Sequence, residues 1–106
     1  KGMVIALVDG NTISQAEYTA MTIQALPRGT TVGSTTLGAD GNIAEIPLPG
    51  GYTTLISGLG VYYPDGSETQ RCGVRIDHWA EPTFAGILAG RDEVLETAIR
   101  IADSLQ

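Results

Sequence analysis

Apolar and polar positions follow different periods along this chain, and each change of period predicts a new element. Residues 3–8 form a continuous apolar run rich in β-branched side chains, typical of a strand buried on both faces of a parallel sheet. A polar turn follows, and apolar residues then recur at helical spacing at Ala16, Ala20 and Ile23. The first part of the chain therefore predicts a strand, a tight turn and a helix.

The next segments complete a βαβ unit and add a hairpin. Residues 26–29 contain a proline and a glycine that end the helical pattern, and residues 30–34 predict a short strand. A strand, a helix and a strand within about thirty residues predict a crossover between parallel strands. Residues 43–48 and 52–57, separated by a Pro-Gly-Gly turn, are expected to pair as a β-hairpin.

The last third of the chain combines an extended pattern with two helical ones. Residues 68–77 predict a strand near their middle, with Cys72 as a small buried packing residue. A short helix is expected over residues 84–88, and residues 91–106 carry the clearest helical pattern. Its apolar stripe comprises Val94, Leu95, Ala98, Ile101, Ala102 and Leu105. We therefore expect a C-terminal amphipathic helix that packs on the domain.

Composition limits the classes of function. A chain of 106 residues with 42% hydrophobic and 17% charged residues suffices for one small domain and is neither disordered nor membrane-like. The net charge of −6 disfavours nucleic acids and anionic membranes as partners. One histidine and one cysteine argue against a metal site, so we expect no metal and no cofactor. The start of the sequence, directly in a strand pattern, suggests a fragment that lacks upstream residues.

Ser14 lies at the predicted junction of the first strand and the first helix, and two interpretations of it remain open. Its hydroxyl would lie beside N–H groups that have no partner within the helix, which could hold an oxyanion. Ser14 is therefore a candidate nucleophile. Ser14 and Glu17 also fit a capping box, as do Thr12 and Gln15 slightly earlier. From this window alone capping is the commoner role, although Thr12 could cap the helix and leave Ser14 free.

Four stretches in fixed order resemble the C-terminal part of the tail-specific (carboxyl-terminal processing) and tricorn-core serine peptidase family. They are residues 8–17, residues 32–38, residues 63–66 with Gly73, Val74 and Asp77, and residues 90–99. The resemblance covers nearly the whole chain and shifts the balance at Ser14 from capping to catalysis. It implies that residues 1–106 are the C-terminal portion of a catalytic domain. The implied fold is an α/β core of the Clp protease and crotonase type, with a β-hairpin excursion.

The resemblance also implies roles for individual residues. Ser14 corresponds to the nucleophile, and the backbone N–H of Gln15 corresponds to one donor of the oxyanion hole. The lysine of the Ser-Lys dyad falls on Ala39, so the chain is closer to the tricorn-like branch, whose base is a histidine from an upstream segment. The acid that orients this base falls on Gln70, with Glu68 as the alternative orienting acid two residues away.

Three functions follow from these observations. The first is a serine endopeptidase that hydrolyses polypeptides by acyl transfer, with this fragment inactive on its own because its base lies upstream. The second is an inactive binding module for a hydrophobic ligand or peptide, suggested by Ala39 and Gln70. The third is a packing layer that self-associates through the face meant for the missing part. His78 is a weaker candidate for a local base.

The relatives that the sequence resembles also suggest a compartment. Tail-specific members usually act outside the cytoplasm, whereas tricorn acts inside it. We therefore expect the periplasm or cell envelope rather than the cytoplasm. No apolar run has the length of a membrane-spanning helix, so none is expected.

Overall fold

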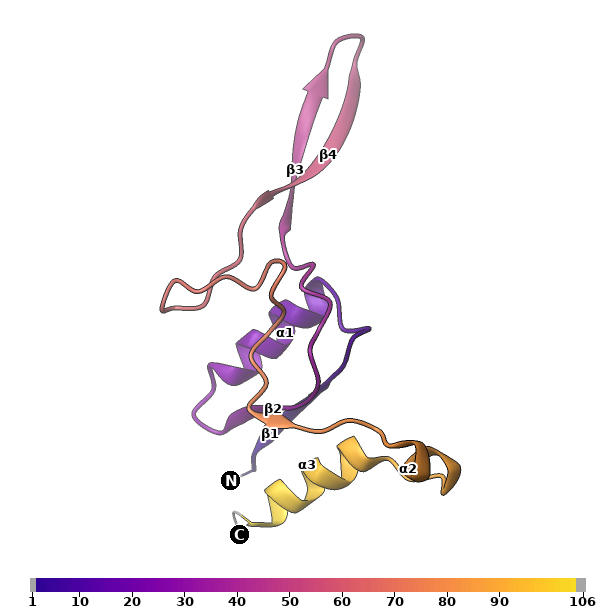
Figure 1. Cartoon of the computed structure of the whole chain (residues 1–106). Coiled ribbons are helices and arrows are strands. Elements are labelled where there is room, and N and C mark those ends of the chain that lie inside the picture. Colours follow the sequence, from indigo (N-terminus) through magenta and orange to yellow (C-terminus); the bar gives the residue numbers. More distant parts are fainter. Residues whose placement is uncertain (1, 105–106) are drawn as a thin grey trace.

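The computed structural model describes residues 2–104, which form two separate β-sheets and three helices (Figure 1). The strands are β1 (Val4–Val8), β2 (Gly29–Gly33), β3 (Asn42–Leu48), β4 (Tyr52–Leu59) and β5 (His78–Trp79). The helices are α1 (Gln15–Gln24), α2 (Phe84–Leu88) and α3 (Glu93–Ser104). The mixed α/β architecture with a hairpin agrees with the sequence prediction.

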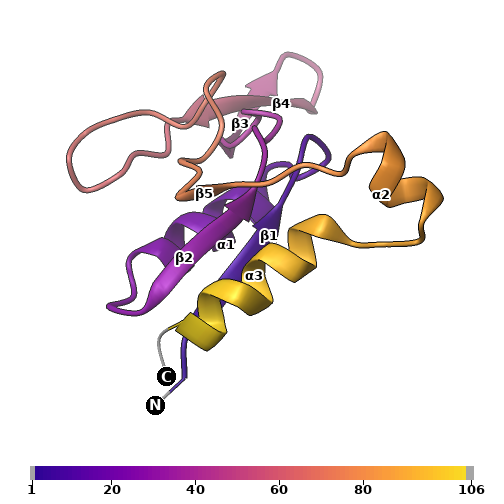
Figure 2. The same cartoon turned by 60° about the horizontal axis from the view of Figure 1, so that its bottom comes forward.

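The first sheet is parallel and has the strand order β1-β2-β5. Val4 lies opposite Gly29 and Val8 opposite Gly33, so β1 and β2 pair along their full length. Helix α1 connects these two strands and packs on them, which confirms the predicted βαβ unit. Helices α1 and α3 cover opposite faces of this sheet (Figures 1 and 2).

The hydrophobic core is small and lies on the α1 side of the sheet. Its buried residues are Val8, Ala20, Met21, Tyr63 and Val74. Strand β1 was expected to be buried on both faces, and this expectation is wrong within the described residues: Val4 and Leu7 are each close to half exposed. The reason is topological, because β1 is the edge strand of the sheet and no further strand pairs with its free side in residues 2–104.

Strands β3 and β4 form the predicted antiparallel hairpin, which projects away from the rest of the molecule (Figure 1). Its turn contains Gly50 and Gly51 at φ 88° and 81°, a left-handed conformation that glycine adopts without strain. All its strand residues except Ala44 are exposed. The radius of gyration is consequently 17.2 Å, against about 13 Å for a compact domain of this length.

The segment between the hairpin and α2 differs most from the sequence prediction. No regular strand forms within residues 68–77; a single bridge joins Tyr62 to Glu68, and the regular strand is β5, which follows this segment. The chain bends at Arg71 and Gly73, at φ 67° and 82°, and this interrupts any extended run. Cys72 is exposed rather than buried because it lies in this bend.

The two C-terminal helices agree with the prediction, apart from the start of α3. Helix α2 has the predicted bounds, whereas α3 begins at Glu93 rather than at residue 91. Its first turn is capped by Asp92, whose Oδ1 accepts a hydrogen bond from Leu95 N–H at 2.9 Å. Gly90, at φ 67°, separates the two helices. The predicted apolar position Leu105 lies outside the described residues.

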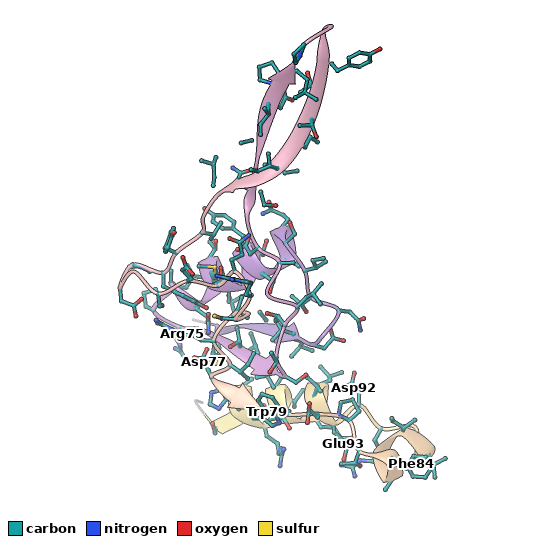
Figure 3. The ribbon with its side chains drawn as sticks, turned by 45° about the horizontal axis from the view of Figure 1, so that its top comes forward. Arg75, Asp77, Trp79, Phe84, Asp92 and Glu93 are labelled. Carbon is teal, nitrogen blue, oxygen red and sulfur yellow. The ribbon has the colours of Figure 1, made fainter. Side chains whose placement is uncertain are left out.

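The carboxylate of Asp77 fixes the segment that leads into β5. Arg75 and Asp77 lie close together in this segment (Figure 3). Asp77 Oδ2 accepts hydrogen bonds from Gln24 Nε2 at 2.9 Å, Thr31 N at 2.9 Å and Thr30 Oγ1 at 3.1 Å. Partial burial opposes ionisation of Asp77, but these hydrogen bonds outweigh it and lower the pKa of the carboxyl. Asp77 therefore links this segment to both α1 and β2.

The Asp77 network makes stability depend on pH in the acid range. Because its folded-state pKa is lowered, the stabilisation is present above the unfolded-state pKa of about 3.9 and is lost as pH falls through the folded-state value. Asp77→Asn should therefore flatten the fall in unfolding free energy between about pH 5 and pH 2. Urea unfolding at several pH values measures the free energy of unfolding, with the exposed Asp103→Asn as control. If the free energy of unfolding depends on pH in the same way in wild type and Asp77→Asn, the prediction is wrong.

Candidate active site

A short turn places Ser14 between β1 and α1. Asp9 Oδ1 accepts a hydrogen bond from Asn11 N–H at 2.9 Å, and Thr12 Oγ1 accepts one from Asp9 N–H at 3.0 Å. The Thr12 hydroxyl is therefore used inside the turn, and the N-cap residue of α1 is Ser14. The expectation that Thr12 could cap the helix is wrong, because its side chain faces back toward the end of β1.

Ser14 has a strained backbone and an exposed side chain. Its φ of 54° and ψ of −118° match the first central position of a type II′ turn, which normally requires glycine. For another residue such a conformation costs about 1–3 kcal/mol, and strain of this kind concentrates at functional sites. Nucleophilic serines of other hydrolases also sit on strained turns between a strand and a helix.

Ser14 and Glu17 form a capping box whose two halves are unequal. Ser14 Oγ faces the backbone N–H of Glu17, as a capping box requires, but without a regular cap hydrogen bond. In the other direction, Ser14 N–H donates to Glu17 Oε2 at 2.9 Å. The carboxylate therefore holds the Ser14 backbone in place while its hydroxyl stays available to a reactant.

Glu17 is fully buried and serves as the anchor of the whole site. Beyond Ser14 N–H, its carboxylate accepts hydrogen bonds from Thr36 Oγ1 at 2.6 Å, Gly38 N at 2.7 Å and Ala39 N at 3.0 Å. Four donors therefore share the charge, as a buried carboxylate requires. This single side chain joins the start of α1 to the loop that follows β2.

The loop around Gly73 and Val74 is held against the loop that follows β2 through the side chain of Thr36. Thr36 Oγ1, which donates to Glu17, also accepts a hydrogen bond from Val74 N–H at 2.9 Å. The loops approach so closely that a Cβ on Gly73 would lie 2.7 Å from Thr36 Oγ1, and one on Gly38 would lie 2.9 Å from the carbonyl carbon of Arg71. The close approach of the two loops therefore explains why a threonine stands at position 36 and glycines stand at positions 38 and 73.

Ser14 opens onto a surface pocket of about 330 Å³. The pocket is lined by Ser14, Gln15, Tyr18, Asp40, Gly41, Asn42 and Val61. Gln15 is the first residue of α1, so its N–H has no partner within the helix. An exposed hydroxyl, a free backbone donor and a mostly polar wall can together accommodate a carbonyl group and the negative charge that develops on it.

Asp40 is a residue of this pocket that the sequence analysis missed. It is only 4% exposed, and its Oδ2 is buried without a hydrogen-bond partner among the described residues. Burial raises the pKa of the Asp40 carboxyl, and the nearby charge of Glu17 raises it further. The only signal in the sequence was its position, directly after Ala39, where the resemblance expects a catalytic lysine.

Of the other predicted site residues, Gln70 lies next to the pocket, whereas Glu68 and His78 do not line it. Gln70 is half-buried and borders the pocket wall, since its Nε2 lies 3.2 Å from the position that a Cβ on Gly41 would occupy. Glu68 is exposed in its bridge to Tyr62 and does not line the pocket. His78 lies in β5 and lines a different depression against α3, so the structure does not bring it to Ser14. Residues 2–104 contain no group of three acidic, histidine or cysteine side chains that could hold a metal.

The sequence of residues 1–79, which includes this entire site, matches the model of Peptidase family S41. The chain belongs to Peptidase family S41. No curated protein matches it. Within the part of the chain that the structure describes, no helix is long and apolar enough to cross a membrane.

Two solved structures show how much of an S41-type fold the chain contains. It is 27% identical to a peptidase candidate from Parabacteroides merdae ATCC 43184, with a TM-score of 0.78, covering 94% of this chain and 31% of that one. It also shares the fold of tricorn protease at 22% identity and a TM-score of 0.76, covering 94% of this chain and 10% of tricorn. The S41 chain thus spans less than a third of either structure.

The anchoring role of Glu17 predicts a large loss of stability for Glu17→Gln. The amide nitrogen would face backbone N–H donors, and each buried donor left without an acceptor costs about 1–3 kcal/mol. We expect the free energy of unfolding to fall by about 2–4 kcal/mol. Chemical denaturation measures the change. Glu45→Gln, on the exposed hairpin, is the matched control and should stay within about 0.5 kcal/mol of wild type.

The Ser14 geometry predicts stability effects opposite to those of an ordinary cap. Loss of a capping serine to alanine destabilises a protein by about 0.5–2 kcal/mol. Because the Ser14 hydroxyl makes no cap hydrogen bond, Ser14→Ala should change stability by less than about 0.5 kcal/mol. Ser14→Gly should stabilise by about 1 kcal/mol through release of backbone strain. A marked loss of stability in both variants, measured by denaturation, would restore the capping interpretation.

Proposed function

We propose that this S41 chain is the C-terminal portion of a serine peptidase catalytic domain, and that Ser14 is its nucleophile. The observation that carries the proposal is the strained and exposed Ser14, whose hydroxyl makes no regular cap hydrogen bond at the start of α1. The backbone strain is maintained by the hydrogen bond to Glu17, at an energetic cost that an inert surface serine would not require.

The proposed reaction is acyl transfer. Ser14 Oγ attacks the carbonyl carbon of a polypeptide bond while a base removes its proton, and the Gln15 N–H donates to the resulting oxyanion. The base then passes this proton to the departing amine as the peptide bond breaks. Water hydrolyses the acyl-enzyme in a second half-reaction. The base, a histidine, and a second oxyanion donor come from a segment outside this chain.

Exposed surfaces support the proposal that another segment completes the domain. Val4 and Leu7 of the edge strand β1 are partly exposed, and side chains on both faces of the β3–β4 hairpin are exposed to solvent. An isolated two-stranded hairpin is marginally stable in water, so a covering surface is expected. Phe84, at 78% exposed, leaves α2 similarly uncovered (Figure 3). We propose that the completed domain has a core of the Clp protease and crotonase type.

A serine-reactive fluorophosphonate tests the nucleophile without knowledge of the substrate. The protein that contains this chain together with its completing segment should be labelled, and Ser14→Ala should abolish the labelling. Ser104→Ala, an exposed serine at the end of α3, is the matched control and should label like wild type. Persistent labelling of Ser14→Ala would overturn the assignment of the nucleophile.

A catalytically inactive binding module is the second candidate function. Ala39 stands where a Ser-Lys dyad would need its lysine, and the neutral Gln70 stands where the resemblance expects an acid. The same fold could then hold a hydrophobic ligand or a peptide without cleaving it. Absence of any labelling in the complete wild-type protein, with retained binding of unfolded peptides, would favour this function over proteolysis.

A further inference from the structure

The unsatisfied carboxylate in the Ser14 pocket suggests a role that the sequence did not. We propose that Asp40 is the positioning residue for the general base of Ser14, accepting a hydrogen bond from the base and stabilising its positive charge. The inference rests on the proposed peptidase function, and it assigns to Asp40 the task that the resemblance placed on Gln70 or Glu68.

Among the acids around Ser14 that residues 2–104 contain, Asp40 alone is available for this task. Glu17 already accepts four hydrogen bonds, two at each oxygen, so it has no free capacity. Gln70 carries no charge, and Glu68 is exposed and outside the pocket lining. Asp40 lines the same pocket as Ser14, and its Oδ2 has no hydrogen-bond partner in the described part of the chain.

Such a carboxylate is costly to keep unless something compensates its charge. A buried, unpaired carboxylate destabilises a protein, and each one found in a native structure calls for an explanation. The residues lining the pocket include no cation; the titratable groups near Asp40 are the Glu17 carboxylate and the Tyr18 phenol. A donor that comes across the pocket from another segment, where the base is also required, would compensate this charge.

The proton path follows from this placement. The Ser14 hydroxyl proton moves to the base as Oγ attacks, which makes the base cationic, and the base then gives this proton to the leaving amine. Asp40 stays ionised throughout, since its role is to orient the base and to stabilise the cation. The carboxylate and the hydroxyl share one pocket, so an imidazole between them could contact both.

The test uses the rate of fluorophosphonate labelling as a function of pH in the complete protein. Asp40→Asn should lower the second-order labelling rate constant by about 100-fold. It should also move the acidic limb of the profile to lower pH, because a base that loses a neighbouring carboxylate has a lower pKa. A merely structural role would lower the amount of active protein without moving this limb.

Two variants make the comparison specific. Glu68→Gln tests the alternative acid and should keep both the rate and the limb, as should the exposed control Asp103→Asn on α3. Thermal unfolding checks that each variant is folded. Asp40→Ser removes the same charge with a smaller side chain and replaces Asp40→Asn if the amide is not accommodated.

Each outcome decides between the proposals. If wild type is labelled and the Asp40 variant keeps the same labelling rate constant and the same acidic limb of the pH profile, this inference is wrong. Ser14 then remains the nucleophile. A shifted limb in Glu68→Gln alone would reassign the role to Glu68. Absence of labelling in wild type, or labelling that survives Ser14→Ala, overturns the proposed function and this inference together.

Discussion

The buried carboxylate of Glu17 is the constraint on which the arrangement of the site depends. It binds the N–H groups of Ser14, Gly38 and Ala39 together with the hydroxyl of Thr36, so one charge fixes two segments that α1 and β2 separate in the sequence. A charge buried to this degree is tolerated only when several donors surround it. The loops are therefore positioned so that their donors reach the Glu17 carboxylate. The strained backbone of Ser14 is held in place by one of these hydrogen bonds.

The rest of the molecule stabilises this site but is itself incomplete as a packing unit. The core cluster is small, the sheet has an open edge at β1, and the hairpin stands apart from it. The chain covers 31% of the related peptidase structure from Parabacteroides merdae, so it corresponds to a part of that fold. The loops around Glu17 are tied together by buried hydrogen bonds, and they lie within residues 1–79, which match the S41 family model.

Glu17 and Asp40 are two buried acids near Ser14 with different hydrogen bonding, and we therefore assign them different roles. Glu17 is saturated with hydrogen bonds and has a structural role, whereas Asp40 is buried beside it with an unsatisfied oxygen. Two carboxylates this close repel, and the repulsion contributes to the raised pKa of Asp40. Natural proteins break local rules of this kind mainly at functional sites, which is why the violation carries more information than the satisfied network.

The sequence by itself determined the local elements: the βαβ unit, the hairpin, α2 and α3, and Ser14 at the start of α1, because periodicity, turn residues and capping act between near neighbours. It did not determine that β1 is an exposed edge, that residues 68–77 bend instead of forming a strand, or that Asp40 is buried. These features depend on contacts between distant segments, such as Thr36 with Val74 and Glu17 with Gly38. Only the tertiary structure brings such groups together, and only there do burial and an unsatisfied oxygen become visible.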